Sequence, residues 1–300
     1  MASQKTPAVP RPSASLIVVN PRNEILLVHR NPKSSAFAGM HVFPGGNFDV
    51  KQDEDLAQTA IRETFEETGL LLAEASDSKQ PNDQDLDKAR EAVHSQKLLF
   101  RDFLAQHRLA LDRRSLLPFT EWITPPNVPK RFQTRFFITF LDTAPASGFS
   151  AGNKVERVPT PDGGQEVIAA RFVHPATALR ECQAKQIALM PPQFYLVTTL
   201  ASILEGGANT PEQRDKVRML SQGAFGRMVL HPRPLPYKTH DGWSVLTYEG
   251  DESRGGAKGR LHRSLVRFEK GGVASEVVLQ RNFDIFTDIE ERLFQGGAKL

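Results

Sequence analysis

Three glutamates and an arginine fall within one short stretch of the sequence, Arg62–Leu70 (RETFEETGL). On a helix, Glu63 and Glu67 lie one turn apart on the same face, with Glu66 beside them. Like charges at this spacing destabilise a helix, and the single positive charge of Arg62 cannot neutralise three carboxylates. A Mg²⁺ or Mn²⁺ ion would relieve the repulsion, because these ions prefer hard oxygen ligands and also bind substrate phosphates. A solvated acidic helix face is the alternative interpretation of these residues.

The acidic stretch follows a glycine turn. Small or apolar residues recur at helical spacing between Asp53 and Thr68, and Gly69 is the expected C-terminal stop. Upstream, Pro44-Gly45-Gly46 forms a turn that glycine enters easily and that presents backbone carbonyls beside the carboxylates. The order of strand, glycine turn, loop, acidic helix and glycine stop therefore predicts one site built from both segments.

This arrangement resembles the signature of the Nudix hydrolase family, G-x5-E-x7-R-E-U-x-E-E-x-G-U, in which U is a bulky apolar residue. Seven residues instead of five separate Gly46 from Glu54, and Thr64 stands where a larger apolar residue is usual. The first departure lengthens a loop, and the second alters helix packing. The matching residues are Gly46, Glu54, Arg62, Glu63, Glu66, Glu67, Gly69 and Leu70.

The resemblance implies a metal centre on the helix. Glu63, Glu66 and Glu67 would hold Mg²⁺ or Mn²⁺, with the Gly45 carbonyl as a further ligand. Arg62 would orient one of the glutamates through a charge-assisted hydrogen bond. Metal ions in such a site bridge diphosphate oxygens, stabilise developing charge and activate the attacking water.

A base must take the proton of that water, and the sequence leaves two candidates open. Glu63 is one of them. Glu166, which opens the strand-like run Glu166–Val173, is the other, and Asp162 is a weaker candidate. Glu54 is expected near the centre in a supporting role.

The fold class implied is α/β: a Nudix-type α/β/α sandwich with a mixed sheet, a helical insertion after the acidic box and a C-terminal β-rich extension. The Gly/Pro-rich residues 144–164 are expected to form a long surface loop. Helices are predicted at Asp53–Thr68, Asp85–Leu109 with a break near His94-Ser95, Pro175–Gln183, Pro191–Leu204 and Thr210–Gln222. Strands are predicted at Ala14–Asn20, Glu24–Arg30, His41–Phe43, Thr120–Thr124, Arg135–Leu141, Glu166–Val173, Val229–Leu230, Trp243–Tyr248, Leu261–Phe268 and Ser275–Leu279.

The domain organisation follows from these elements. We expect a flexible N-terminus at residues 1–12 and a Nudix hydrolase domain at residues 13–208, with its helical insertion at about residues 75–115. Residues 209–295 are expected to form the β-rich extension, either as a continuation of the main sheet or as a separate small sheet. Residues 296–300 are interpreted as a targeting tail.

Two further segments are similar to coenzyme A diphosphatases. They are Leu26–Gly46, upstream of the box, and Met190-Pro191-Pro192-Gln193-Phe194-Tyr195, which opens a helix. This resemblance implies hydrolysis of coenzyme A or acyl-coenzyme A to 3′,5′-ADP and (acyl-)4′-phosphopantetheine. The substrate-binding residues expected from it are Arg30, His41, Phe43, Gly46, Gln193 and Phe194. The 3′-phosphate of coenzyme A also requires a cation, for which the candidates are Arg30, His29, Lys33, Lys130 and Arg131.

Composition and the C-terminus bear on partners. A net charge of +3 over 300 residues does not suggest a nucleic-acid coat protein, and no apolar run approaches the length of a membrane span. The chain ends in Ala298-Lys299-Leu300 after two glycines, similar to the peroxisomal address S-K-L. The expected partners are a nucleotide of the coenzyme A class and the peroxisomal import receptor, with no nucleic acid and no membrane. Location in the peroxisome, or otherwise in the cytoplasm, is expected.

Three other functions are compatible with the same motif. The same chemistry could act on ADP-ribose, NADH or another nucleoside diphosphate derivative, because Nudix proteins share the box and differ in substrate. An RNA-cap hydrolase is disfavoured by the small net charge and the C-terminal tripeptide. A non-catalytic nucleotide-binding module would keep the fold without the reaction, but the intact glutamates argue against it.

Overall fold

A computed structural model describes residues 7–34, 37–75, 81–141, 167–269 and 272–289. Its main sheet contains β1 (Arg11–Val19), β2 (Ile25–Arg30), β3 (His41–Val42), β4 (Gly45–Asn47), β7 (Leu117–Ile123), β8 (Phe132–Phe140), β9 (Val167–Val173) and β10 (Val229–Leu230). Six strands follow the order β10-β7-β8-β1-β2-β3, while β4 pairs with β1 and β9 pairs with β2. The β1–β8 and β10–β7 pairs are parallel and the others are antiparallel, so the sheet is mixed as predicted.

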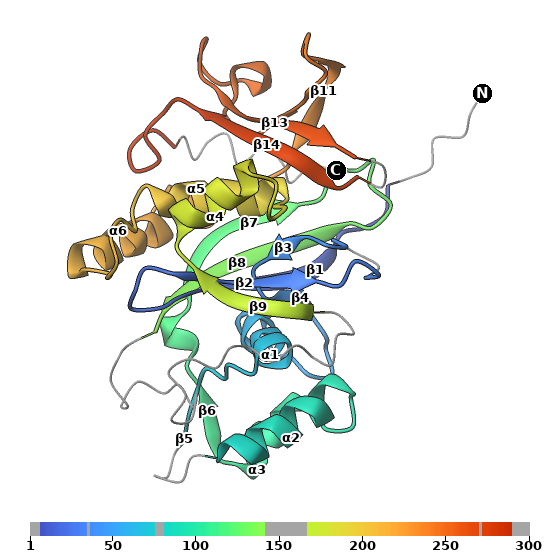
Figure 1. Ribbon diagram of the computed structural model, residues 1–300, viewed down its shortest axis with the longest axis vertical. Helices are drawn as coiled ribbons and strands as arrows, with labels where there is room; N and C mark the ends of the chain where they lie inside the picture. The colour runs from blue at the N-terminus through green and yellow to red at the C-terminus, as the bar shows by residue number, and fades with distance from the viewer. Residues whose placement is uncertain (1–6, 35–36, 76–80, 142–166, 270–271, 290–300) are drawn as a thin grey trace.

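The helix α1 (Leu56–Thr68), which carries the acidic box, covers one face of this sheet (Figure 1). The Asp55 side chain accepts a hydrogen bond from the backbone N–H of Gln58, which satisfies a free donor of the first turn. Gly69 has a φ of 75° and its N–H donates to the carbonyl of Phe65. The helix therefore ends where the sequence predicts, but it begins at Leu56 because Asp55 is its cap.

The segment after α1 forms a small layer outside that helix (Figure 1). It contains α2 (Asp83–His94), α3 (Phe100–Gln106) and a two-stranded sheet of β5 (Ala73–Ala75) and β6 (Leu109–Leu111), followed by the short helix η1 (Arg113–Ser115). The predicted helix break after His94 is confirmed. Phe65 of α1 stacks on Phe103 of α3 with ring centroids 5.5 Å apart, so this layer buries the outer side of α1.

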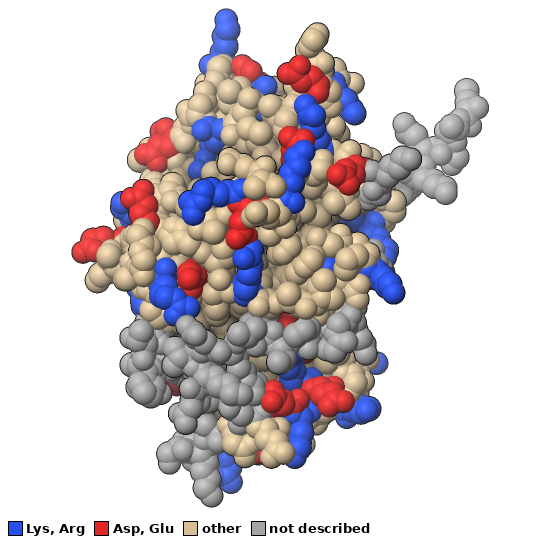
Figure 2. Space-filling view, in the orientation of Figure 1, with Lys and Arg blue, Asp and Glu red and all other residues tan. Residues whose placement is uncertain are grey.

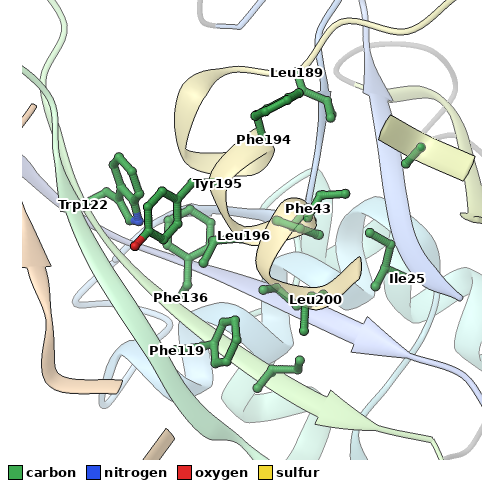
Figure 3. Close-up of a cluster of buried hydrophobic side chains, with 14 of the residues drawn as sticks. Ile25, Phe43, Phe119, Trp122, Phe136, Leu189, Phe194, Tyr195, Leu196 and Leu200 are labelled. Atoms are coloured by element: carbon green, nitrogen blue, oxygen red, sulfur yellow. The ribbon is translucent and has the colours of Figure 1, made fainter. Parts of the chain in front are cut away.

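Helices on the other face complete the sandwich (Figure 1). They are α4 (Pro175–Gln183), α5 (Pro191–Ala201), α6 (Pro211–Gln222) and the short α7 (Ala224–Arg227). The first three begin with proline, whose fixed φ suits the first helical turn. Figure 3 shows the core between α5 and the sheet, where Phe194, Tyr195 and Leu196 meet Phe43, Phe136 and Trp122.

The C-terminal region forms a second sheet above the α4–α5 layer (Figure 1). It contains β11 (Arg233–Lys238), β12 (Ser244–Thr247), η2 (Glu252–Arg254), β13 (His262–Phe268) and β14 (Ala274–Arg281), and the strand order is β11-β12-β13-β14. The sequence did not predict β11 because Pro234 and Pro236 interrupt its pattern. Proline is tolerated here because β11 is an edge strand. The two arrangements predicted for this region, a continuation of the main sheet and a separate small sheet, both occur. Strand β10 extends the main sheet, while β11–β14 form a separate one.

The charged side chains on the visible face alternate in sign. Figure 2 shows Lys and Arg interspersed with Asp and Glu over the described residues of that face, which fits the small net charge of +3. Within the described ranges, no helix combines the length and apolar character that crossing a membrane would require.

Candidate active site on helix α1

Arg62 is the centre of an ion-pair cluster on α1. Its Nε and Nη2 donate to the two carboxylate oxygens of Asp53, each at 2.8 Å. Its Nη1 donates to Glu63 Oε1 at 2.9 Å and to Glu66 Oε1 at 2.8 Å. Nη2 also donates to the carbonyl of Asn47 at 3.0 Å. Because Arg62 and Asp53 are buried, these charge-assisted bonds form where water screens them little.

Glu67 joins the acidic helix to the glycines of β4. Its Oε2 accepts a hydrogen bond from the Gly45 N–H at 3.0 Å, and its Oε1 accepts one from Arg30 Nη1 at 3.1 Å. The predicted contact between the glycine segment and the helix is therefore present, made by the Gly45 N–H, but the prediction of a turn at Gly45-Gly46 is wrong because both glycines lie in β4 and pair with β1. The role of the Gly45 carbonyl as a metal ligand stays a prediction.

Both glycines of β4 are required by close approach. A Cβ on Gly46 would stand 2.5 Å from Cδ and Oε1 of Glu63, so the carboxylate lies directly over this glycine. A Cβ on Gly45 would stand 2.4 Å from the backbone oxygen of Ala14 on the neighbouring strand. Any side chain at Gly46 would displace the Glu63 carboxylate, and one at Gly45 would separate β4 from β1.

The surroundings of Glu63 and Glu66 shift the pKa values of these two carboxylates in opposite directions. Burial raises the pKa of Glu63 to about 7, with the charges of Glu66 and Asp53 adding to the shift and Arg62 opposing it. Burial also acts to raise the pKa of Glu66, but hydrogen bonds from His94 and Arg62 and the charge of Arg62 outweigh it and lower that pKa. At neutral pH Glu66 is therefore ionised, while Glu63 lies near its midpoint, where a carboxylate can accept and return a proton.

The charges of the cluster bear on metal binding. Its members are the carboxylates of Asp53, Glu63, Glu66 and Glu67 and the guanidinium groups of Arg30 and Arg62. Four negative charges and two positive charges give a net charge of minus two when every group is ionised, which one divalent cation would neutralise. Oxygen-only donors of this kind suit Mg²⁺ or Mn²⁺. Across the described part of the chain, however, no group of three or more His, Cys, Asp or Glu side chains is arranged to hold a metal ion. The donor chemistry thus fits a divalent cation, whereas the described geometry is one of ion pairs.

Four of the predicted substrate contacts lie away from this cluster. His41 stacks on His29 with ring centroids 4.3 Å apart, on the opposite face of the sheet from Arg30. Phe43, Gln193 and Phe194 are 2%, 8% and 7% exposed, and Phe43 and Phe194 belong to the core between the sheet and α5 (Figure 3). Their positions give no support to a substrate contact, whereas Arg30 and Gly46 do lie at the cluster.

The other predicted residues divide in two groups. Glu54 pairs with Arg113 at 2.7 Å and its side chain is 71% exposed, so it does not contact Arg62. The alternative base Glu166, Asp162 and the tripeptide Ala298-Lys299-Leu300 lie outside the described residues.

Sequence reasoning missed Asp53. It lies next to Glu54 in the sequence, nine residues before Arg62, and only its acidic character could have drawn attention to it. It also missed Arg90 of α2, whose Nε donates to the backbone carbonyl of Glu66 at 2.8 Å and so ties the inserted layer to the acidic helix. No motif marks Arg90, because its partner is a backbone atom 24 residues away.

A family model described as the NUDT19 Nudix domain matches residues 49–200, about half of the chain, including the acidic box. The chain belongs to the Nudix family. A Caenorhabditis elegans protein whose name describes it as nudix hydrolase 7 is 25% identical to this Nudix chain over 197 residues, which are 64% of this chain and 61% of that protein. The acyl-coenzyme A diphosphatase NUDT19 of Xenopus laevis is 26% identical over 238 residues, covering 59% of each protein.

The chain therefore spans 61% and 59% of the length of these two relatives. Among solved structures, the crystal structure of a NUDIX hydrolase from Alicyclobacillus acidocaldarius matches with a TM-score of 0.51 and 24% identity. The match covers 65% of this chain and 92% of that one. This likeness shows that the Nudix fold is present.

Proposed function

We propose that this Nudix protein is a metal-dependent hydrolase that cleaves the pyrophosphate linkage of coenzyme A or acyl-coenzyme A. The products would be 3′,5′-ADP and (acyl-)4′-phosphopantetheine. The observation that carries the proposal is the acidic cluster itself, in which the Glu63 carboxylate lies over Gly46 and is held by Arg62. The name of the Xenopus laevis relative, acyl-coenzyme A diphosphatase, supports the substrate class.

Glu63, Glu66 and Glu67 would hold the divalent cation, which when bound supplies charge neutralisation for the diphosphate and a more acidic water molecule. Arg62 positions Glu63 and Glu66 by donating to both of them from one nitrogen atom. Glu63, whose carboxylate lies over Gly46 and accepts a hydrogen bond from Arg62, is the described candidate for the base that takes the proton of the attacking water. Glu166 stays the alternative base.

Arg30 is the described cation best placed to contact a substrate phosphate. Its Nη1 contacts Glu67 at 3.1 Å, and its side chain is 13% exposed. A guanidinium matches the geometry of a phosphate, and its contact with Glu67 places Arg30 beside the carboxylates that would hold the cation and the diphosphate. The contact of Arg30 with Glu67 thus supports its predicted role in substrate binding.

The proposal extends to location. The Ala298-Lys299-Leu300 terminus would bind the peroxisomal import receptor and direct the enzyme to the peroxisome. The test is whether a fluorescent protein carrying these residues at its C-terminus enters peroxisomes, and whether replacing Leu300 abolishes entry. Diffuse fluorescence from the unaltered tail would contradict the proposal.

The activity is tested by incubating the full chain with Mg²⁺ and, separately, coenzyme A, an acyl-coenzyme A, ADP-ribose and NADH, with products resolved by mass. We expect 3′,5′-ADP from the two coenzyme A substrates. Glu67→Gln should raise the activation free energy by several kcal/mol, which lowers the rate roughly 10²-fold or more. Glu91→Gln, an exposed glutamate of α2, is the matched control and should leave the rate unchanged.

The outcomes separate the alternatives. Turnover of ADP-ribose or NADH alone would keep the metal site but exclude coenzyme A as substrate. Equal rates for Glu67→Gln and the unaltered chain would assign the activity to a contaminant or to another site. No turnover of any substrate would favour the non-catalytic nucleotide-binding module.

A further inference from the structure

A pocket of about 650 Å³ opens between the N-terminal end of α1 and strands β7 and β8, and its lining includes no member of the acidic cluster. Its size is that of a small-molecule site. Apolar side chains form much of its wall, and one basic and one acidic side chain of the sheet also line it. The residues that matter here are Phe48, Leu56, Pro118, Phe137, Glu121 and Arg135.

One row of register partners connects this pocket to the acidic cluster. Gly46 on β4 is opposite Ala14 on β1, Ala14 is opposite Arg135 on β8, and Arg135 is opposite Glu121 on β7. Neighbouring strands are about 4.8 Å apart, so Arg135 lies roughly 10 Å and Glu121 roughly 14 Å from Gly46 along the sheet. The Glu63 carboxylate lies over Gly46, and the pocket therefore begins within one nucleotide's length of it.

A β-bulge turns Glu121 into the pocket. Pro118 and Glu121 are three residues apart and would face opposite sides of a regular strand, yet both line the pocket because the register shifts between them. Thr120, inside the bulge, has a φ of 75°, which is strained for a β-branched residue. Trp122 Nε1 donates to Thr120 Oγ1 at 3.1 Å, and the Glu121 N–H donates to the Met228 carbonyl at 2.8 Å. The fold thus maintains a strained backbone whose consequence is the orientation of Glu121.

Arg135 and Glu121 form a loose pair. The Nη1 and Oε2 atoms are 3.6 Å apart, longer than a hydrogen bond, and the side chains are 20% and 15% exposed. The second carboxylate oxygen, Oε1, accepts a hydrogen bond from Gln133 Nε2 at 2.5 Å. A guanidinium has five donors and a carboxylate about four acceptor sites, so both groups can still bind a ligand.

The lining excludes two kinds of occupant. A phosphate is disfavoured because three carboxylates, those of Glu54, Asp55 and Glu121, line the pocket and outnumber the two guanidinium groups that face them, Arg135 in the lining and Arg113, which pairs with Glu54 and Asp55. A hydrocarbon chain is disfavoured because it would cover the charges of Arg135 and Glu121 without hydrogen-bonding to them, which costs free energy. An uncharged aromatic ring with a donor and an acceptor on one edge satisfies both the walls and the pair.

We propose that this pocket binds the adenine base of the substrate. This rests on the proposed function, which places the diphosphate at Glu63. The exocyclic amino group of adenine donates to Glu121, and an adjacent ring nitrogen accepts from Arg135, which matches the donor–acceptor edge that adenine presents. Phe48 and Phe137 contact the ring faces. The sheet register thus sets the spacing between base recognition and bond cleavage.

The first test needs no variant. The full chain with Mg²⁺ is titrated calorimetrically with AMP and with IMP, in which a carbonyl oxygen replaces the amino group. AMP has no pyrophosphate bond to cleave, so binding is measured independently of turnover. We expect AMP to bind about 10-fold more tightly or better, because IMP turns an acceptor toward the Glu121 carboxylate. Equal affinities would overturn the proposal, as would a failure to bind AMP.

The second test removes the pair. The double variant Glu121→Leu/Arg135→Leu leaves no single charge unpaired, so the fold is expected to tolerate it. It should bind AMP about 10-fold more weakly and lose the preference over IMP. The matched control is Arg171→Leu/Glu181→Leu, an ion pair of the same residue types joining β9 to α4 on the other face of the sheet.

Each result decides the question. If the Leu variant binds AMP like the unaltered chain and instead lowers KM for long acyl chains, the pocket holds the acyl chain and the proposal is wrong. If AMP selectivity is present but no substrate is hydrolysed, the pocket assignment stands and the proposed function fails. If coenzyme A is hydrolysed but AMP and IMP bind equally well, the proposed function stands and the pocket assignment fails. If the double variant does not fold, the AMP–IMP comparison decides alone.

Discussion

Arg62 donates two hydrogen bonds of 2.8 Å, one to each carboxylate oxygen of Asp53. The two side chains are 5% and 0% exposed. Burial acts to lower the pKa of Arg62, but its hydrogen bonds to Asp53 and the charges of the neighbouring carboxylates outweigh burial and raise that pKa, so the guanidinium stays charged. This forked pair fixes the plane of the guanidinium, which leaves Nη1 between Glu63 and Glu66. Asp53 thus positions two glutamates that it does not contact.

The first prediction concerns this pair. Asp53→Asn removes the negative charge that faces a buried guanidinium, so the free energy of unfolding should fall by about 3 kcal/mol. Glu54→Gln is the matched control, because Glu54 pairs with Arg113 in solvent and should contribute less than about 1 kcal/mol. Urea unfolding of both variants measures the difference. Equal losses would show that Asp53 does not hold Arg62 in place.

A second prediction concerns the glycine under Glu63. Gly46→Ala places a Cβ 2.5 Å from the Glu63 carboxylate, which must move away. Because a displacement of about 1 Å in a catalytic group can reduce a rate by 10²-fold, we expect a loss of that order with little change in stability. Gly207→Ala is the control, since its Cβ would meet nothing within 4 Å. Full activity of Gly46→Ala would exclude Glu63 from the reaction.

The third prediction concerns the metal. Since the carboxylates of the cluster outnumber its guanidinium groups by four to two, Mg²⁺ should bind the folded chain and stabilise it. At 100 times its dissociation constant, it should raise the free energy of unfolding by about 2.7 kcal/mol. Thermal unfolding with and without Mg²⁺ measures this without any substrate. Glu67→Gln should diminish the shift, and an unaltered chain indifferent to Mg²⁺ would contradict the metal site.

A fourth prediction concerns pH and the C-terminal sheet. His262 Nδ1 donates to the Glu249 carbonyl at 2.6 Å, so Nε2 accepts from the Tyr195 hydroxyl at 3.0 Å. Burial lowers the pKa of His262 from 6.5 to about 4, with the Glu249 hydrogen bond opposing the shift and Arg281 adding to it. Between these values the unfolded chain binds a proton that the folded chain does not. Stability is therefore fully present above pH 6.5 and falls as the pH drops toward 4, by up to about 3 kcal/mol.

The measurement is the difference in unfolding free energy between the unaltered chain and His262→Gln across pH 4 to 7. The unaltered chain should lose more stability on acidification than the variant. His240→Gln replaces a fully exposed histidine and should leave the pH dependence unchanged. Parallel curves for the unaltered chain and His262→Gln would rule out a neutral, buried His262.

The sequence by itself determined what depends on local spacing. Glu63, Glu66 and Glu67 share a helix because three and four residues make one turn, and Gly69 ends that helix because it enters the left-handed region. The strands around it were visible because their apolar, β-branched runs are bounded by turn residues.

Only the tertiary structure decided which residues face one another. The first four residues of β2 are all buried because helices cover both faces of the sheet. The strand therefore lacks an alternation of apolar and polar residues that would have shown which face each side chain takes. Only the structure shows that Arg30 faces α1 while His29 and His41 face away. Asp53 rather than Glu54 reached Arg62 because the Asp55 cap sets where the chain enters α1. Glu121 and Arg135 came into line with Gly46 through the pairing of four strands and a bulge, and such long-range register leaves no local signal in the sequence.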